Sequence, residues 1–214
     1  MNTDELRRIV CEGNKQLPIN KLVTWTSGNV LVRDPKTNLV GVKPSGVHFD
    51  QLTEDKIVIL DLEGNVIEGS LKPSSDAFTG LYVLRNMPHI NSVIHTHSNY
   101  ATAFAACGMN IPCVLTAMCD EFGGDIVCAP YCKIGDEEIG EAIVKYNGGK
   151  NAVLIRNHGV FTLGVSMEEA LKAAVMCEDT AKTVYIAKTI GDIIPIPEKE
   201  IERAHNRYVT KYGQ

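Results

Sequence analysis

The stretch Val93-Ile94-His95-Thr96-His97-Ser98 is an apolar run that ends in two histidines separated by one residue. A buried β-strand directs alternate side chains to opposite faces, so His95 and His97 are expected to point the same way, close enough to share a cation. Two alternating histidines can equally be hydrogen-bonded residues at a strand end, so the spacing alone leaves both interpretations open. A third histidine, His158, follows the apolar run 152–155, which predicts another buried strand. We therefore expect three histidines at strand ends.

The composition indicates a chain with a substantial hydrophobic core. The sequence has 214 residues, 44% of them hydrophobic, and contains no linker, so we expect a single domain over residues 1–214. The net charge of −5 and the scattered lysines and arginines lack the electrostatic footprint of a protein that binds nucleic acid or an anionic membrane. A small soluble partner is expected instead.

Two further features of the sequence predict the compartment. Residues 1–17 are polar and charged, unlike a signal peptide, and no later stretch approaches the ~20 apolar residues that a transmembrane helix needs. The seven cysteines are odd in number, scattered and set in apolar surroundings, which is typical of reduced thiols rather than of a disulfide framework. We therefore expect a cytoplasmic protein.

Hydrophobic periodicity predicts a mixture of helices and strands. A first amphipathic helix is expected from Thr3 until Pro18 ends it. The predicted strands are residues 22–26, 30–33, 40–42, 56–61, 93–97 and 152–155, and the further predicted helices are residues 76–87, 100–107, 139–146 and 167–188. Residues 117–125, which contain three acids and a glycine pair, are predicted to form a loop.

Three short polar loops in the first half of the chain share one chemistry. They are Ser27-Gly28-Asn29, Lys43-Pro44-Ser45-Gly46 and Ser74-Ser75. Glycine lets a backbone approach an oxyanion closely and a lysine adds a point charge, so convergence of the three loops would make a phosphate cradle. Each loop taken alone is an ordinary turn, so the prediction depends on their convergence.

Five motifs occur in one order along the chain: Ser27-Gly28-Asn29, Lys43-Pro44-Ser45-Gly46, Pro73-Ser74-Ser75-Asp76, His95-Thr96-His97-Ser98 and Asn157-His158-Gly159. Together they resemble the class II sugar-phosphate aldolase/epimerase family over nearly the whole chain. The resemblance implies a three-layer α/β/α fold with a central, mostly antiparallel sheet. It also implies a homotetramer whose active sites lie between subunits.

The resemblance further implies a role for each residue of the motifs. His95, His97 and His158 would bind a divalent metal, usually zinc, with Asp76 as fourth ligand. The phosphate group of a sugar-phosphate substrate would be held by Gly28, Asn29, Lys43, Ser45, Gly46, Ser74 and Ser75. Asp120 and Tyr212 would exchange protons with the substrate. Asp76 is ambiguous, because a carboxylate beside a cation can be its ligand or, when displaced by substrate, a catalytic base.

Two reactions of the family remain open at this stage. The motifs, the Thr116/Asp120 pair and the closing Tyr212-Gly213-Gln214 most resemble L-ribulose-5-phosphate 4-epimerases, whereas L-fuculose-phosphate aldolases typically have glutamate in place of Asp76. The segment between Cys132 and Ala152 is closer in length to the aldolase. Both reactions begin with retro-aldol cleavage, in which a Lewis-acid cation stabilises the developing negative charge. An aldolase releases the aldehyde, whereas an epimerase rotates it and re-forms the bond.

We expect the epimerase reaction from these motifs. The first alternative is an aldolase that acts on L-fuculose 1-phosphate or a related ketose phosphate. The second is a non-catalytic binding module like the adducin head, which would be expected to lack a complete set of three histidines.

Overall fold

The centre of the molecule is an eight-stranded sheet. The computed structural model describes residues 1–211. The strands lie in the order β4-β3-β2-β1-β5-β8-β7-β6, and β6 and β7 form the one parallel pair among them. Their bounds are β1 Asn29–Arg33, β2 Val40–Val42, β3 Val58–Leu60, β4 Val66–Glu68, β5 Ser92–Thr96, β6 Cys128–Ala129, β7 Ala152–Ile155 and β8 Gly159–Gly164. The predicted mostly antiparallel sheet is confirmed.

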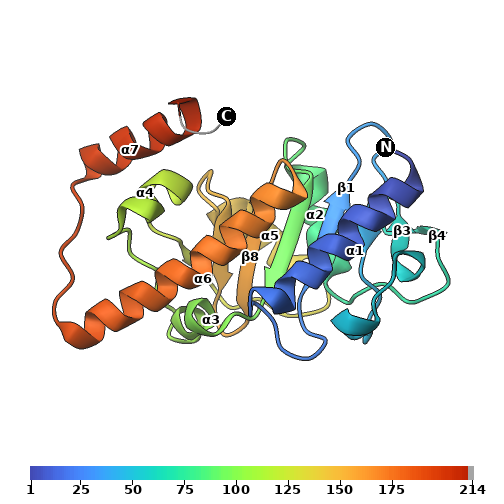
Figure 1. The fold of residues 1–214 in the computed structure, drawn as a ribbon, viewed down its shortest axis with the longest axis horizontal. Coiled ribbons are helices and arrows are strands. Elements are labelled where there is room, and N and C mark those ends of the chain that lie inside the picture. Colours follow the sequence, from blue (N-terminus) through green and yellow to red (C-terminus); the bar gives the residue numbers. More distant parts are fainter. Residues whose placement is uncertain (212–214) are drawn as a thin grey trace.

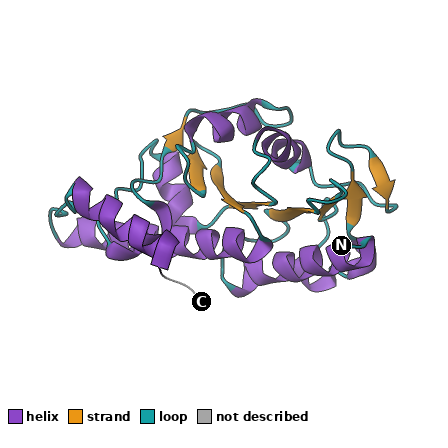
Figure 2. Ribbon diagram, turned by 90° about the horizontal axis from the view of Figure 1, so that it is seen from above, coloured by secondary structure: helices purple, strands orange, loops and turns teal. Residues whose placement is uncertain are grey.

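Helices cover both faces of this sheet, as Figures 1 and 2 show. On one face lie α1 (Thr3–Ile19), α3 (Asn99–Ala106) and α6 (Met167–Ile190), and on the other lie α2 (Ala77–Asn86) and α5 (Glu138–Tyr146). The alternation of side chains along β5 explains both layers: Val93 packs in the core under α2 and α5, and Ile94 packs under α1 and α6. The predicted three-layer α/β/α fold is therefore confirmed.

The ends of the helices follow ordinary capping chemistry in two places. The Asn2 side chain accepts a hydrogen bond from the Glu5 N–H at 2.8 Å at the start of α1. The Ser166 hydroxyl accepts one from the Glu169 N–H at 3.3 Å at the start of α6. Two 3-10 helices, η1 (Phe49–Gln51) and η2 (Glu54–Lys56), connect β2 to β3.

No helix within residues 1–211 combines the length and the apolar character that crossing a membrane requires.

Three local predictions were wrong. Residues 22–26 form a loop with a turn at 25–26 rather than a strand, and Pro18 lies inside the last turn of α1 instead of ending it. The predicted loop 117–125 contains a helix, α4 (Thr116–Phe122), which ends at Gly123 with a φ of 62°. Because glycine has no Cβ, it takes this left-handed conformation at low cost and stops a helix without a proline. A further helix, α7 (Glu198–Lys211), packs against α4 and was not predicted.

Candidate metal and phosphate site

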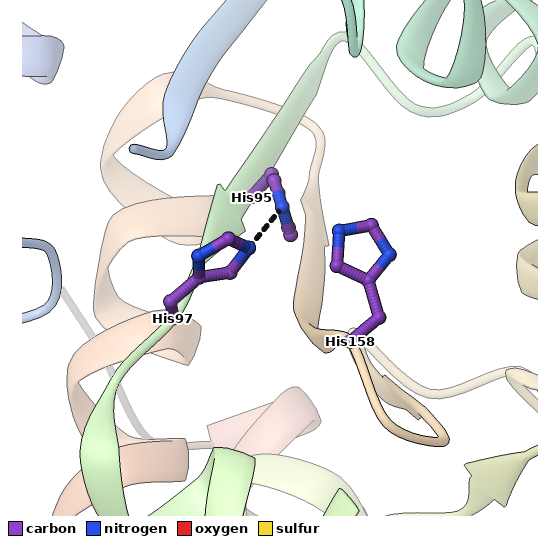
Figure 3. Close-up of side chains that lie close together, drawn as sticks. All are labelled: His95, His97 and His158. Atoms are coloured by element: carbon purple, nitrogen blue, oxygen red, sulfur yellow. Dashed lines mark hydrogen bonds between the residues drawn. The ribbon is translucent and has the colours of Figure 1, made fainter. Parts of the chain in front are cut away.

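Three histidines from separate points of the chain meet at one end of β5 (Figure 3). His95 belongs to β5, His97 lies just beyond its end, and His158 lies in the turn between β7 and β8. Since β5 pairs with β8, with His95 opposite Phe161, the turn that precedes β8 is brought to the end of β5. One ring nitrogen from each histidine lies within 4.8 Å of the others.

The protonation of these rings suits a metal ligand. His95 is buried, and its Nδ1 lies 3.0 Å from the Val160 carbonyl oxygen, which can only accept a hydrogen bond. Nδ1–H is therefore the donor, and the lone pair of His95 is on Nε2, which lies 2.9 Å from His97 Nε2. The other ring nitrogen of a metal-binding histidine is commonly held in this way by a backbone carbonyl.

Burial keeps the three imidazoles neutral near pH 7. It lowers the pKa of His95 well below its ordinary value, and the neighbouring imidazoles lower it further. Burial also lowers the pKa of His97 and of His158, although the Asp76 carboxylate opposes part of that effect. Neutral imidazole is the form that binds metal. Within residues 1–211, His158 Nδ1 is buried without a hydrogen-bond partner, so the cluster fits a divalent cation.

Gly159 allows this close approach. A Cβ at this position would lie 2.6 Å from the Thr96 carbonyl oxygen and 2.7 Å from Cδ2 of His97. Such distances are too short for any side chain, so the turn that carries His158 can lie against the end of β5 because residue 159 is glycine.

Two of the predicted phosphate loops are joined by backbone hydrogen bonds. The Ser45 N–H donates to the Lys72 carbonyl at 2.9 Å, and the Ser74 N–H donates to the Lys43 carbonyl at 3.1 Å. These loops, the histidines and the Ser27-Gly28 turn surround one cavity of about 310 Å³. It is lined by Thr26, Ser27, Gly28, Lys43, Ser45, Gly46, Ser74, Ser75, Asp76, His95, His97, Ile134 and His158.

Lys43 is a buried cation on the wall of this cavity. Only 2% of it is exposed, and burial lowers the pKa of its ammonium group. Its Nζ donates to the Thr26 carbonyl at 3.4 Å, and among residues 1–211 no carboxylate lies within ion-pair distance of it. Because a buried charge without a counter-ion is costly, this arrangement favours an anionic ligand in the cavity.

Asn29 lies behind the cavity rather than on its wall. Its Nδ2 donates to Ser74 Oγ at 3.2 Å and to Asp76 Oδ2 at 3.2 Å. It therefore holds two residues that do line the cavity. Asp76 faces the same cavity as the histidines, although the group of metal-ligating atoms within 4.8 Å of one another contains only the three imidazoles.

One of the two predicted proton donors, Asp120, does not line this cavity in the single chain. Asp120 lies on α4, where its carboxylate is 3.5 Å from Arg207 of α7 and its carbonyl accepts a hydrogen bond from His205 Nδ1 at 2.8 Å. It lines a separate hollow between α4, α6 and α7. Tyr212 lies outside the described residues.

Sequence reasoning missed two residues on the cavity wall, Thr26 and Ile134. Ser27 belongs to one of the three predicted phosphate loops, although no individual role was assigned to it. Ile134 carried no signal, since it is a half-exposed apolar residue in the loop before α5 and resembles any other surface isoleucine.

The fold and the cavity define a mixed α/β protein with a candidate metal centre beside a candidate anion site. The comparison with known families is more specific. Residues 8–185 match the Class II Aldolase and Adducin N-terminal domain family, and the chain belongs to this family. The family predicted from the five motifs is confirmed.

Solved structures with the same fold include sugar-phosphate aldolases. The chain is 29% identical to an L-fuculose 1-phosphate aldolase, with a TM-score of 0.91 over 96% of each chain. It is 24% identical to YgbL of Klebsiella pneumoniae, described as a putative aldolase/epimerase/decarboxylase, with a TM-score of 0.84 over 95% of this chain and 99% of that one. For the L-fuculose-1-phosphate aldolase of Thermus thermophilus, the identity is 21% and the TM-score 0.74, over 88% of this chain and 98% of that one. The last two share the fold.

Proposed function

We propose that this protein is a metal-dependent aldolase that cleaves and forms a carbon–carbon bond in a ketose phosphate, L-fuculose 1-phosphate or a close analogue. The observation that carries the proposal is one cavity lined both by three neutral histidines and by the buried Lys43, whose ammonium group has no carboxylate within ion-pair distance among residues 1–211. The similarity to the L-fuculose 1-phosphate aldolase supports the choice of reaction. We therefore favour the aldolase reaction over the epimerase reaction that the sequence motifs indicated.

His95, His97 and His158 would hold the divalent cation, zinc being the first choice for three imidazoles. When bound, the cation supplies a Lewis acid that stabilises negative charge developing on the substrate oxygens. Asp76 faces the same space, fixed by the amide of Asn29, and would act as fourth ligand or as the base that takes a proton from the substrate.

The substrate phosphate would lie against the joined loops 43–46 and 72–75. Lys43 would supply the charge, and the hydroxyls of Ser45, Ser74 and Ser75 would donate hydrogen bonds. Gly28 and Gly46 have positive φ values, of 83° and 71°, and no Cβ, so their backbone can approach a phosphate oxygen closely. Asn29 would act through Ser74 and Asp76.

Asp120 and Tyr212 remain the candidates for proton transfer. Because Asp120 lines a different hollow of its own chain, it would serve the cavity of a neighbouring subunit. This role supports the homotetramer with shared active sites that the family resemblance implied. The proposal therefore includes an assembly in which α4 and α7 of one chain approach the histidines of another.

The epimerase is the second candidate, and Asp76 is the residue that favours it. The epimerase branch carries aspartate where the aldolases typically carry glutamate, and this chain has aspartate. The two reactions share the bond cleavage and differ in whether the aldehyde leaves. The same cavity serves either outcome.

Product analysis tests the proposal. The zinc-loaded protein is offered L-fuculose 1-phosphate and, separately, L-ribulose 5-phosphate, and the products are followed by NMR. We expect dihydroxyacetone phosphate and free aldehyde from the first substrate, with loss of turnover after chelation. Conversion of the second substrate to D-xylulose 5-phosphate without free aldehyde would favour the epimerase. Inactivity on both, together with a failure to bind metal, would favour a non-catalytic module.

A further inference from the structure

The chain leaves the sheet after Thr96, just before His97, the second candidate metal ligand. The pairing of β5 with β8 ends at Thr96, opposite Val160. His97 lies between that last pair and Ser98, the N-cap residue of α3. His97 is thus the histidine of the cluster that directly precedes the start of α3.

The start of α3 is not capped by its own N-cap side chain. Ser98 has the extended backbone of an N-cap residue, but its hydroxyl makes no capping hydrogen bond and is buried without a partner among residues 1–211. The first N–H groups of a helix need acceptors from elsewhere when the N-cap residue supplies none.

Glu178 of α6 supplies those acceptors across the fold. Its Oε1 accepts a hydrogen bond from the Tyr100 N–H at 3.0 Å, and its Oε2 accepts one from the Ala101 N–H at 2.9 Å. A carboxylate at a helix N-terminus also interacts favourably with the helix dipole. Since α6 packs on β5 and β8, Glu178 connects the start of α3 to the same strands that carry the histidine cluster.

We propose that Glu178 is a positioning residue for the metal centre: by holding the first turn of α3, it fixes the segment 97–99 and with it the His97 ring. On its other side His97 is limited by Gly159, where a Cβ would lie 2.7 Å from Cδ2 of His97. The inference rests on the metal role proposed above for the three histidines. It assigns a function to a residue on α6 that does not line the histidine cavity.

Metal affinity, measured without any substrate, tests this role. The variants are Glu178→Ala, which removes both acceptors, and Glu178→Gln, which keeps one. The matched control is Asp179→Asn, because Asp179 is the adjacent, exposed acid on α6 and lines the same surface hollow as Glu178. Zinc affinity is measured by competition with a chromophoric chelator, and the unfolding free energy of each metal-free variant by urea titration.

We expect Glu178→Ala to weaken zinc binding about 10- to 100-fold, as is typical when the support of a metal ligand is lost. Glu178→Gln should weaken it less, and Asp179→Asn should stay within about twofold of the wild type. A purely structural role would lower the urea stability of Glu178→Gln and leave the zinc affinity of the folded protein unchanged, which would overturn the proposal. Equal losses in Asp179→Asn would overturn it too, by assigning the effect to charge.

Zinc binding by the wild-type protein separates the positioning role of Glu178 from the proposed function. Wild-type protein that binds zinc tightly while the Glu178 variants bind it equally well would refute the positioning role alone. Wild-type protein that binds no divalent metal would refute both.

Discussion

Two regions of this molecule hold the residues to which the proposed function assigns roles, and they differ in how many of those residues they bring together within one chain. The cavity at the end of β5 gathers its histidines and phosphate loops within one chain. The α4–α7 region carries Asp120, and a separate hollow lies beside it. The first region is fixed by strand pairing and the second by helix packing at one end of the fold (Figure 1). Under the proposed function, one chain would bind metal and phosphate by itself and would complete proton transfer only in an assembly.

The largest expected effect is on the first region. His158→Ala should abolish stoichiometric metal binding and activity, because a tight site needs three or four protein ligands. His158 is only partly buried, so the fold should survive. His89→Ala, at an exposed histidine away from the cavity, is the matched control. Metal content by mass spectrometry and circular dichroism measure the outcome. Full metal content in His158→Ala would remove that residue from the ligand set.

Next in size is the effect of the second region on turnover. Asp120→Asn should lower kcat by about 10²- to 10⁴-fold, the range for loss of a general acid or base, while zinc content stays at the wild-type level. Steady-state kinetics and metal analysis on the same preparation measure both quantities. A parallel fall in zinc content would place Asp120 in the metal site and contradict the separation of the α4–α7 region from the histidine cavity.

Mixing subunits of two variants tests whether the active site is shared between chains. Asp120→Asn and His158→Ala should each have little or no activity, but a co-assembled tetramer would contain sites with intact histidines from one chain and Asp120 from another. We expect the mixture to regain activity that neither variant has alone. If co-assembled protein remains as inactive as the two variants, the site is not shared between subunits.

A smaller effect is expected at Lys43. Lys43→Met should weaken the binding of a phosphorylated substrate by about tenfold to a hundredfold, since a charge-assisted hydrogen bond contributes roughly 1.5–3 kcal/mol. The loss for an unphosphorylated analogue should be much smaller. Lys72→Met, at an exposed lysine of the adjoining loop, should leave both affinities unchanged. Equal losses on the two ligands would show that Lys43 is structural.

The smallest effect is expected at the contact between α4 and α7. His205→Ala removes the hydrogen bond from Nδ1 to the Asp120 carbonyl and should lower the free energy of unfolding by about 1 kcal/mol. Zinc affinity should not change, because His205 lies outside the histidine cavity. Urea titration and metal competition measure the two quantities. A change in zinc affinity here would show that the two regions are coupled within one chain.

The sequence carried most of the information for the first region because its residues lie in short motifs on strongly apolar strands. The run Val93–Ile94 before His95 and the run Ala152–Ile155 before His158 predicted buried strands, and both strands are present. The three-layer fold also followed from the ordered motifs. The motifs could not predict which loops lie close together in space. The convergence of loops 43–46 and 72–75 depends on two backbone hydrogen bonds between residues far apart in sequence.

The second region was less predictable for a physical reason. α4 is a seven-residue helix that contains two acids and is followed by a glycine pair, a composition typical of a loop, and tertiary contacts with α7 override that local preference. α7 itself is amphipathic but mostly polar and buries no residue fully, so few apolar residues mark it in the sequence. The contacts of Glu178 were equally unpredictable from the sequence, since they join it to Tyr100 and Ala101, nearly eighty positions away.

The most direct test of the central claim is the metal stoichiometry of the wild-type protein and its dependence on the histidine cluster. The protein is stripped with a chelator, titrated with zinc, and assayed for cleavage of L-fuculose 1-phosphate at each step. We predict one tightly bound zinc per chain and activity that rises in proportion to it. Saturating activity without bound metal, or zinc that binds equally well to the His158→Ala variant, would contradict the assignment of His95, His97 and His158 as the metal centre.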